Sequence, residues 1–242
     1  MTASSGDIRS AEDHSNSRRE ELAAGLTSTR ELIEQLAKDS GRQDVPELLP
    51  VTKFHPAADI ALLAELGIKD VAENREQEAR GKAEELPDVH FHMIGQVQTK
   101  KANHVARWAH SVHSVDTEKL ANALNRGVDN AGRESLPVFI QVSYDGDTAR
   151  GGVALDGVEE LAKIIEDLPN LELRGLMVVP PLDTDAKEVF SAVRELADSL
   201  GEQLKRPMKL SAGMSADLKE AIAAGTDIVR VGTGIMGARQ LG

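Results

Sequence analysis

The chain has 242 residues, with 28 Lys and Arg against 40 Asp and Glu, a net charge of −12 and no cysteine. The lack of cysteine excludes disulfides, thiolate metal sites and cysteine nucleophiles, and the acidic balance disfavours general attraction to nucleic acid or anionic membranes. Aromatic residues make up only 2% of the chain, too few for a base-stacking platform, so we expect an aliphatic core.

The first predicted segment, residues 1–17, is polar and of mixed charge. It has no apolar stretch that would mark a signal peptide or an anchor, and we predict a disordered tail. Apolar residues at helical spacing from Leu22 to Leu36 then predict a helix over residues 17–38. No stretch of about 18 consecutive apolar residues follows, so we expect no transmembrane helix and a cytoplasmic location.

After this helix, apolar runs of strand length alternate with stretches of helical periodicity. The eight predicted strands are residues 48–52, 70–72, 90–94, 111–115, 136–143, 171–179, 208–212 and 227–232. Predicted helices between them include residues 57–66, 118–124, 158–168, 186–200 and 216–223. This alternation predicts an α/β fold, a single-domain (β/α)₈ barrel of the TIM type over residues 18–242 with an extra N-terminal helix. An open doubly wound sheet is the alternative, but the glycine-rich turn that normally follows its first strand is absent.

Lys53 ends the first predicted strand, in the segment VTKFHP. Sites in such barrels form at the carboxyl ends of the strands, where a lysine is partly desolvated. Desolvation would lower the pKa of the amine and free the neutral form that condenses with a carbonyl. A strand-end lysine that extends into water is the alternative interpretation.

Two glycine-containing turns follow the seventh and eighth predicted strands, at residues 213–215 and 232–234. This is the usual place for a phosphate in a barrel, because unpaired amides at helix starts favour an anion. Ordinary helix caps and turns are the alternative.

Further polar residues lie within or just after other strands. Arg230 lies in the last strand, where a buried charge must face the barrel mouth or pair with a carboxylate. Asn74 follows the second strand and either contacts a ligand or caps the next helix. His90 and His92 share a strand face, but no acidic residue close in sequence completes a ligand set, so no metal site is predicted.

Five segments together resemble, in order and spacing, the pyridoxal phosphate homeostasis proteins. They are VTKFHP, AENREQE, FHMIGQVQTKKANHV, LRGLMVVP and LSAGMSADLKEAIAAGTDIVRVGTGIMGAR, and the similarity extends over about residues 48–239. The resemblance implies a barrel similar to the N-terminal domain of bacterial alanine racemase. It also implies that pyridoxal 5′-phosphate (PLP) is the cofactor, with a role in PLP homeostasis rather than an established turnover.

The resemblance implies one set of cofactor-binding residues: Lys53, Asn74, His92, Met214, Ser215, Arg230, Gly232 and Thr233. Lys53 would hold PLP as a Schiff base, and Arg230 would face the pyridine nitrogen. Ser215, Gly232 and Thr233 would bind the phosphate together with backbone amides around Met214, and Asn74 and His92 would lie near the ring.

The sequence departs from the family pattern in two places. Where the family often has a tyrosine after Glu73-Asn74, this chain has Arg75, so no aromatic ring can stack from that position. Where the family often has a lysine before a glycine after the fifth strand, this chain has Arg150, which keeps the charge without the same geometry.

Three functions are open at this point: a PLP carrier for storage and delivery, an amino-acid racemase that uses PLP, and a Schiff-base aldolase. Arg230 favours the carrier, because a guanidinium only donates and leaves a facing pyridine nitrogen unprotonated, which makes the ring a weak electron sink. The racemase takes a tyrosine base from a second domain, and the single tyrosine here, Tyr144, follows the fifth strand. We expect PLP, PLP-dependent apo-enzymes and amino acids as partners, no nucleic acid or membrane, no metal and a monomer.

Overall fold

The structure is a computed structural model that describes residues 5–238. Eight parallel strands form the wall of a barrel: β1 (Glu47–Pro50), β2 (Asp70–Glu73), β3 (His90–Met93), β4 (Ala109–Val115), β5 (Leu136–Ser143), β7 (Leu171–Val178), β8 (Lys209–Ser211) and β9 (Ile228–Val231). They follow the order β1-β9-β8-β7-β5-β4-β3-β2, and a single bridge between Val51 and Ala72 joins the two outer strands. The barrel is therefore nearly closed, and the predicted eight-stranded fold is confirmed. A ninth strand, β6 (Val153–Ala154), pairs only with the end of β5 and is too short for the sequence pattern to predict.

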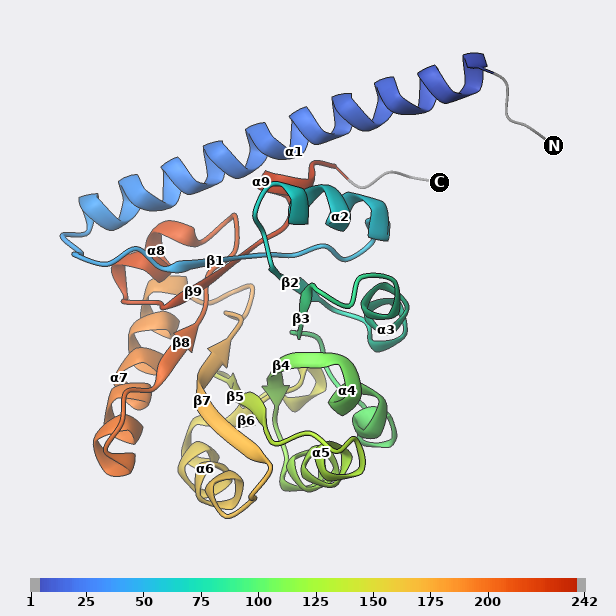
Figure 1. The fold of residues 1–242 in the computed structure, drawn as a ribbon. Helices are drawn as coiled ribbons and strands as arrows, with labels where there is room; N and C mark the ends of the chain where they lie inside the picture. Colours follow the sequence, from blue (N-terminus) through green and yellow to red (C-terminus); the bar gives the residue numbers. More distant parts are fainter. Residues whose placement is uncertain (1–4, 239–242) are drawn as a thin grey trace.

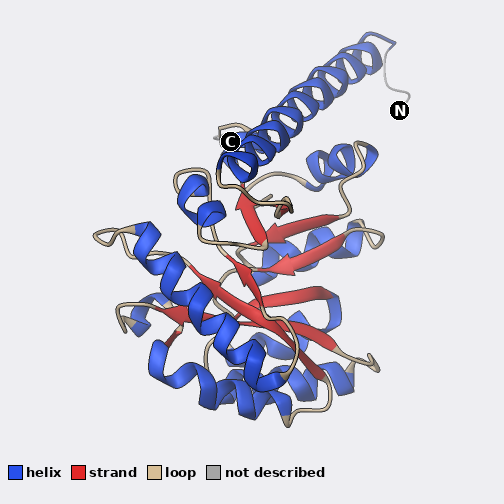
Figure 2. Ribbon diagram, turned by 90° about the vertical axis from the view of Figure 1, so that its left-hand side faces the viewer, coloured by secondary structure: helices blue, strands red, loops and turns tan. Residues whose placement is uncertain are grey.

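Helices connect the strands and surround the sheet (Figure 1, Figure 2). They are α2 (Ala57–Glu65), α3 (Glu76–Glu85), α4 (Ala102–Trp108), α5 (Glu118–Asn130), α6 (Val158–Glu166), α7 (Ala186–Leu204), α8 (Leu218–Ala223) and α9 (Thr233–Met236), with short 3₁₀ turns η1 (Thr99–Lys101), η2 (Thr148–Arg150) and η3 (Leu155–Gly157). Among residues 5–238 no helix combines the length and apolar character needed to cross a membrane.

The first helix, α1 (Ser5–Asp39), begins earlier than predicted and lies across α2, α8 and α9 (Figure 1). The predicted disordered tail is corrected for residues 5–17, which are helical, whereas residues 1–4 lie outside the described part. Once the contacting part of a helix has formed, each added residue contributes one hydrogen bond, so the helix can continue through a polar segment even though Ser, Asp and Asn are weak helix formers. Arg18 fixes the helix by donating to Asp59 Oδ2 at 2.7 Å and to the Met236 carbonyl at 2.8 Å.

The core is aliphatic as predicted, and the strands bury both faces. The larger apolar clusters lie between the sheet and the helices. A smaller cluster fills part of the barrel interior: Leu49, Val51, Ala72, Phe139, Met177 and Ile228. Other inward-facing positions of the strands carry buried polar side chains, so the interior of the barrel is partly polar.

Candidate functional site

A cavity of about 330 Å³ opens at the carboxyl ends of the barrel strands. Four predicted site residues lie in its lining: Lys53 after β1, Asn74 after β2, Met214 after β8 and Arg230 on β9. The ends of β3, β5 and β7 and the loop after β5 complete the wall. The structure therefore brings these four residues together at the end of the barrel where sites form, in a volume suited to a small ligand.

Lys53 is half-buried and is carried by a strained turn. The next residue, Phe54, has φ of +69°, which is unusual for an aromatic residue and costs about 1–3 kcal/mol. Its amide donates to Glu78 Oε1 at 2.7 Å, so α3 holds the turn that aims Lys53.

Lys82 on α3 also holds the turn that carries Lys53. Its ammonium donates to the Thr52 carbonyl at 3.0 Å and to Glu73 Oε1 and Glu78 Oε1 at 2.7 Å each. Glu73 is fully buried, and this burial raises its pKa against the opposing effect of Lys82. Sequence reasoning missed Lys82, although its spacing of four residues from Glu78 matches a helical ion pair.

Asn74 lies at the rim because two loops approach closely. A Cβ at Gly95 would lie 2.0 Å from the Asn74 carbonyl oxygen, so only glycine permits this approach. The N-cap of α3 is Arg75, with no side-chain cap. Asn74 therefore does not cap this helix, and its side chain lies in the cavity lining.

Arg230 is buried on the inward face of β9, and no ion pair joins it to a carboxylate in the described part of the chain. Nη1 donates to Ser211 Oγ at 2.8 Å and Nη2 to the Val178 carbonyl at 3.0 Å. Burial lowers the pKa of Arg230 to about 10, partly opposed by the charge of Asp217, so the side chain remains a cation at neutral pH. Of the two predicted alternatives, the structure supports the one in which Arg230 faces the mouth.

Hydrogen bonds continue from Arg230 through the barrel to its other end. We call the following six side chains the interior network: Arg230, Ser211, His113, Ser111, His92 and Asp70. From the arginine to the aspartate, the successive distances are 2.8, 3.0, 2.9, 2.7 and 2.9 Å. Every member except Asp70 is buried, so the network connects the cavity with the amino-terminal end of the barrel.

The two ends fix the direction of each bond in the interior network. Arg230 can only donate, and ionised Asp70 can only accept. With neutral imidazoles, this requires Nε2–H on both His92 and His113, each accepting at Nδ1 from a serine hydroxyl. Burial lowers the pKa of His113 well below its usual value, which agrees with a neutral ring.

The two predicted phosphate turns lie at the carboxyl end, but of their residues only Met214 lines the cavity. Gly213 has φ of +97°, and a Cβ there would lie 2.6 Å from Ala221 Cβ, so glycine is required. Ser215 and Thr233 are exposed, and Gly232 precedes α9. The sequence did not reveal that the carboxylate of Asp217 already accepts from the Met214 amide at 2.5 Å. An anion bound to that amide would have to displace Asp217.

The family departures also have structural consequences. The guanidinium of Arg75 lies 5.0 Å from the Phe54 ring centroid, so a cation takes the place of a stacked ring. Arg150 pairs with Asp145 and Asp147. The Tyr144 hydroxyl donates to Glu188 Oε1 at 2.7 Å, and this bond raises the pKa of the phenol. Tyr144 is therefore poorly suited to act as a base.

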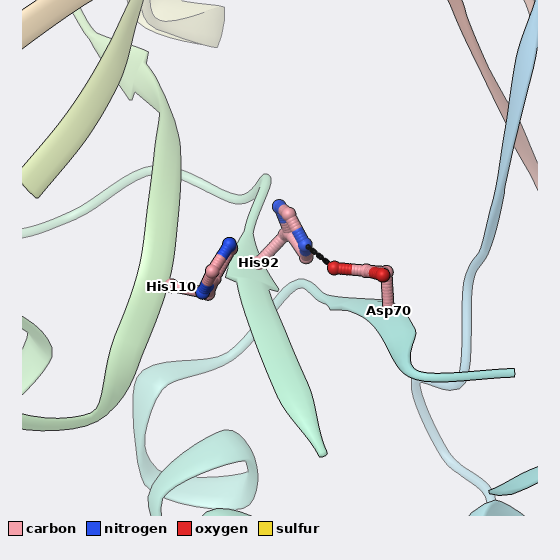
Figure 3. Close-up of side chains that lie close together, drawn as sticks. All are labelled: Asp70, His92 and His110. Carbon is pink, nitrogen blue, oxygen red and sulfur yellow. Dashed lines mark hydrogen bonds and ion pairs between the residues drawn. The ribbon is translucent and has the colours of Figure 1, made fainter. Parts of the chain in front are cut away.

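His92 does not reach this cavity. It lines a second cavity of about 270 Å³ at the amino-terminal end, together with Asp70 and His110 (Figure 3). The structure does not bring His92 together with Lys53 and Arg230, because its side chain lines the amino-terminal cavity and not the carboxyl-end cavity. Asp70 lies 22 residues before His92 but contacts it from the neighbouring strand, a partnership that the spacing along the chain did not predict.

Comparisons with known proteins agree with this geometry. Residues 26–240 match the family model for the alanine racemase N-terminal domain. Alanine racemase from Clostridium difficile shares the fold, with a TM-score of 0.65 at 18% identity over 85% of this chain and 55% of that one. The fold and site thus define a barrel of the alanine racemase N-terminal type.

Curated relatives define the family more closely. A pyridoxal phosphate homeostasis protein from Corynebacterium glutamicum is 56% identical over 80% of this chain and 90% of the relative. The Mycobacterium tuberculosis protein of the same name is 40% identical over 93% and 95%. PipY from Synechococcus elongatus, solved with PLP bound, has a TM-score of 0.77 at 33% identity over 89% of this chain and 100% of that chain. The chain belongs to the pyridoxal phosphate homeostasis protein family.

Proposed function

We propose that this protein binds PLP in the carboxyl-end cavity and serves PLP homeostasis by storing the cofactor and delivering it. One observation carries the proposal: the half-buried amine of Lys53, just after β1, and the buried guanidinium of Arg230, on the paired strand β9, line the same cavity. The amine of Lys53 would condense with the aldehyde of PLP to form a Schiff base, with release of one water. When bound, PLP supplies an electron-withdrawing ring that stabilises negative charge on an attached amino acid.

The donor set fits the cofactor. Arg230 would donate to the pyridine nitrogen, and the turns around Ser215 and Thr233 offer hydroxyls and amides to the phosphate. Asn74 and Met214, which line the cavity, would border the ring. Release of the Met214 amide by Asp217 would accompany phosphate binding, because one N–H cannot serve both acceptors well.

The residues support a carrier better than a racemase. Arg230 is a donor without a carboxylate partner, so it leaves a pyridine nitrogen unprotonated and the ring a weak electron sink. The hydroxyl of Tyr144 is engaged by Glu188, so the described residues hold no tyrosine poised as an opposing base.

The covalent link is tested by borohydride reduction of the yellow protein, followed by peptide mapping. Reduction should label the peptide that contains Lys53, and Lys53→Ala should lose the label completely. Lys119→Ala, an exposed lysine on α5, is the matched control and should keep it. Full labelling of Lys53→Ala would show that another lysine carries PLP.

The carrier role is tested separately by two assays on the loaded protein. It should restore activity to a PLP-dependent apo-enzyme, and it should exchange the Cα proton of L- or D-alanine in D₂O negligibly. Exchange at about 1–10³ s⁻¹ that is lost in Lys53→Ala would support the racemase instead.

A further inference from the structure

The amino-terminal end of the barrel holds a cluster of metal-ligating side chains that the proposed PLP function does not use. Asp70, His92 and His110 come from the consecutive strands β2, β3 and β4 and lie side by side in Figure 3. One ligand atom from each lies within 4.8 Å of the other two. We propose that these three residues bind a divalent transition-metal ion of the zinc class.

The donor set suits that class of ion. Two imidazole nitrogens and one carboxylate oxygen are common zinc ligands, at about 2.0–2.2 Å from the ion, so a tetrahedral site separates its ligand atoms by roughly 3.3 Å. His92 Nε2 and Asp70 Oδ1 are 2.9 Å apart, close to that spacing. His110 is exposed and needs only a small movement to join them. The adjoining cavity of about 270 Å³ leaves room for a water as the fourth ligand.

Neighbouring side chains orient the ligands. His92 Nδ1 lies 2.7 Å from Ser111 Oγ. With a metal on Nε2 the ring proton would move to Nδ1 and donate to this hydroxyl, which reverses the direction that this bond has in the metal-free interior network. The ring of His110 stacks on His90, with centroids 4.1 Å apart and planes 11° from parallel. The contact of His92 with Ser111 is typical of metal sites, where the second nitrogen of a ligating histidine usually has a fixed partner, and stacking on His90 supports the ring of His110.

Two cations border the same cavity, but each has an acidic partner. Arg174 pairs with Glu172 at 2.9 Å, and Lys209 pairs with Glu47 at 3.7 Å. These pairs reduce their repulsion of a bound cation, while Asp70 supplies negative charge at the site itself.

The position of the cluster gives the ion a structural role. β1 and β2 are joined by one isolated bridge, so the barrel wall is weakest there. An ion held by ligands from β2, β3 and β4 would tie β2, the strand beside this seam, to β3 and β4. An ion that binds only the folded chain raises the melting temperature as its concentration rises.

The test is calorimetric titration of ZnCl₂ into the full chain after removal of adventitious metal by a chelator. We expect one equivalent to bind, with affinity at least 100-fold weaker in His110→Ala and Asp70→Asn. Ser111→Ala, which removes the orienting hydroxyl, should weaken binding about 10-fold. The matched control is His104→Ala, which removes a partly exposed imidazole on α4 outside the cluster and should bind like the parent.

CoCl₂ provides a second readout, because cobalt with nitrogen and oxygen ligands in a four-coordinate site gives visible absorption bands. The bands should appear in the parent and in His104→Ala and be absent from His110→Ala. If His110→Ala does not fold, His110→Gln replaces it. No zinc binding up to about 1 mM, or equal binding by the parent and both ligand variants, would overturn the proposal.

Discussion

The two ends of this barrel use the same strands for different chemistry. At the carboxyl end, Lys53 and Arg230 place two basic groups in one cavity. At the amino end, Asp70 lies among histidines. Among the described residues Arg230 contacts no carboxylate, and Asp70 contacts His90 and His92, so a buried cation and a carboxylate lie at opposite ends of one hydrogen-bonded network.

The interior network relates these two ends. Its bonds all point from the guanidinium to the carboxylate, so their dipoles are aligned with the charges at both ends. Aligned hydrogen bonds polarise one another, so a change at one end of the network alters the strength of the hydrogen bonds at the other end. Arg230 is thus buried with neutral hydrogen-bond acceptors and, among the described residues, without a direct ion pair, while the charge of Asp217 opposes the effect of its burial.

The largest effect is expected at the turn that supports the carboxyl end. Lys82→Met leaves the buried carboxylate of Glu73 without its cation, which should destabilise the protein by about 3–5 kcal/mol and lower the Tm by about 10 °C. Lys101→Met, which removes a half-exposed partner of Glu76, is the matched control and should cost less than about 1 kcal/mol.

The loss in Lys82→Met should also depend on pH. Burial already raises the pKa of Glu73, and without Lys82 nothing comparable opposes that rise. The folded variant then holds a proton on Glu73 that the unfolded chain releases near its usual pKa of 4.5. The stabilisation that this proton gives the folded variant is fully present below the unfolded pKa. It is lost as pH rises, by about 1.4 kcal/mol of unfolding free energy per pH unit, until the folded pKa of Glu73 is passed. Urea denaturation at pH 5, 6 and 7 measures it, and an equal deficit at all three would contradict the explanation.

The next effect comes from breaking the interior network near the cavity. Ser211→Ala removes the acceptor of Arg230 and the donor to His113, both of them buried, and should cost about 2 kcal/mol in urea denaturation. Ser211→Thr keeps the hydroxyl and should recover part of this loss. A Ser211→Ala protein as stable as the parent would mean that the network contributes nothing to folding.

The site at the carboxyl end of the barrel could be predicted from the sequence, because its position follows general rules of barrels. Lys53 and Arg230 could be placed because residues at strand ends, and polar residues in a strand, meet at the mouth of a parallel barrel. His92 was assigned to the same end because the motif FHMIG marks a family and not a depth along the strand. Its true partners, Asp70 and Ser111, lie on neighbouring strands, and strand register cannot be read from spacing along the chain.

The same limit explains the other differences. The start of α1 was predicted from the apolar residues that pack against neighbouring helices. The helix itself continues beyond these contacts toward the N-terminus as far as Ser5. The displacement required of Asp217 at the Met214 amide depends on a side-chain rotamer, which no sequence pattern specifies.

A smaller effect is expected from energetic coupling between the two ends of the interior network. Asp70→Asn and Ser211→Ala change residues on β2 and β8 that share no direct contact in the interior network, so independent sites would give additive losses. We expect a coupling of about 0.5–1 kcal/mol in a double-mutant cycle, because both variants interrupt the same aligned bonds. Asp70→Asn with Ser114→Ala is the control cycle and should be additive within about 0.3–0.5 kcal/mol. Additivity in both cycles would mean that the ends are independent.

The smallest effect is expected at Ser114, which shares strand β4 with Ser111. Both side chains are buried, but the hydroxyl of Ser111 has two imidazole partners, whereas Ser114 Oγ has no hydrogen-bond partner among residues 5–238. Ser111→Ala should therefore cost about 1–3 kcal/mol. Ser114→Ala removes a hydroxyl that was desolvated without compensation, and the gain offsets the small void it leaves, so stability should stay equal to the parent or rise by up to about 1 kcal/mol. Both variants delete a hydroxyl oxygen from the same strand. The difference between their free energies of unfolding, measured by urea denaturation, therefore gives the contribution of the hydrogen bonds that Ser111 makes in the interior network. A loss in Ser114→Ala as large as that in Ser111→Ala would assign the cost to burial of the strand and not to the hydrogen bonds.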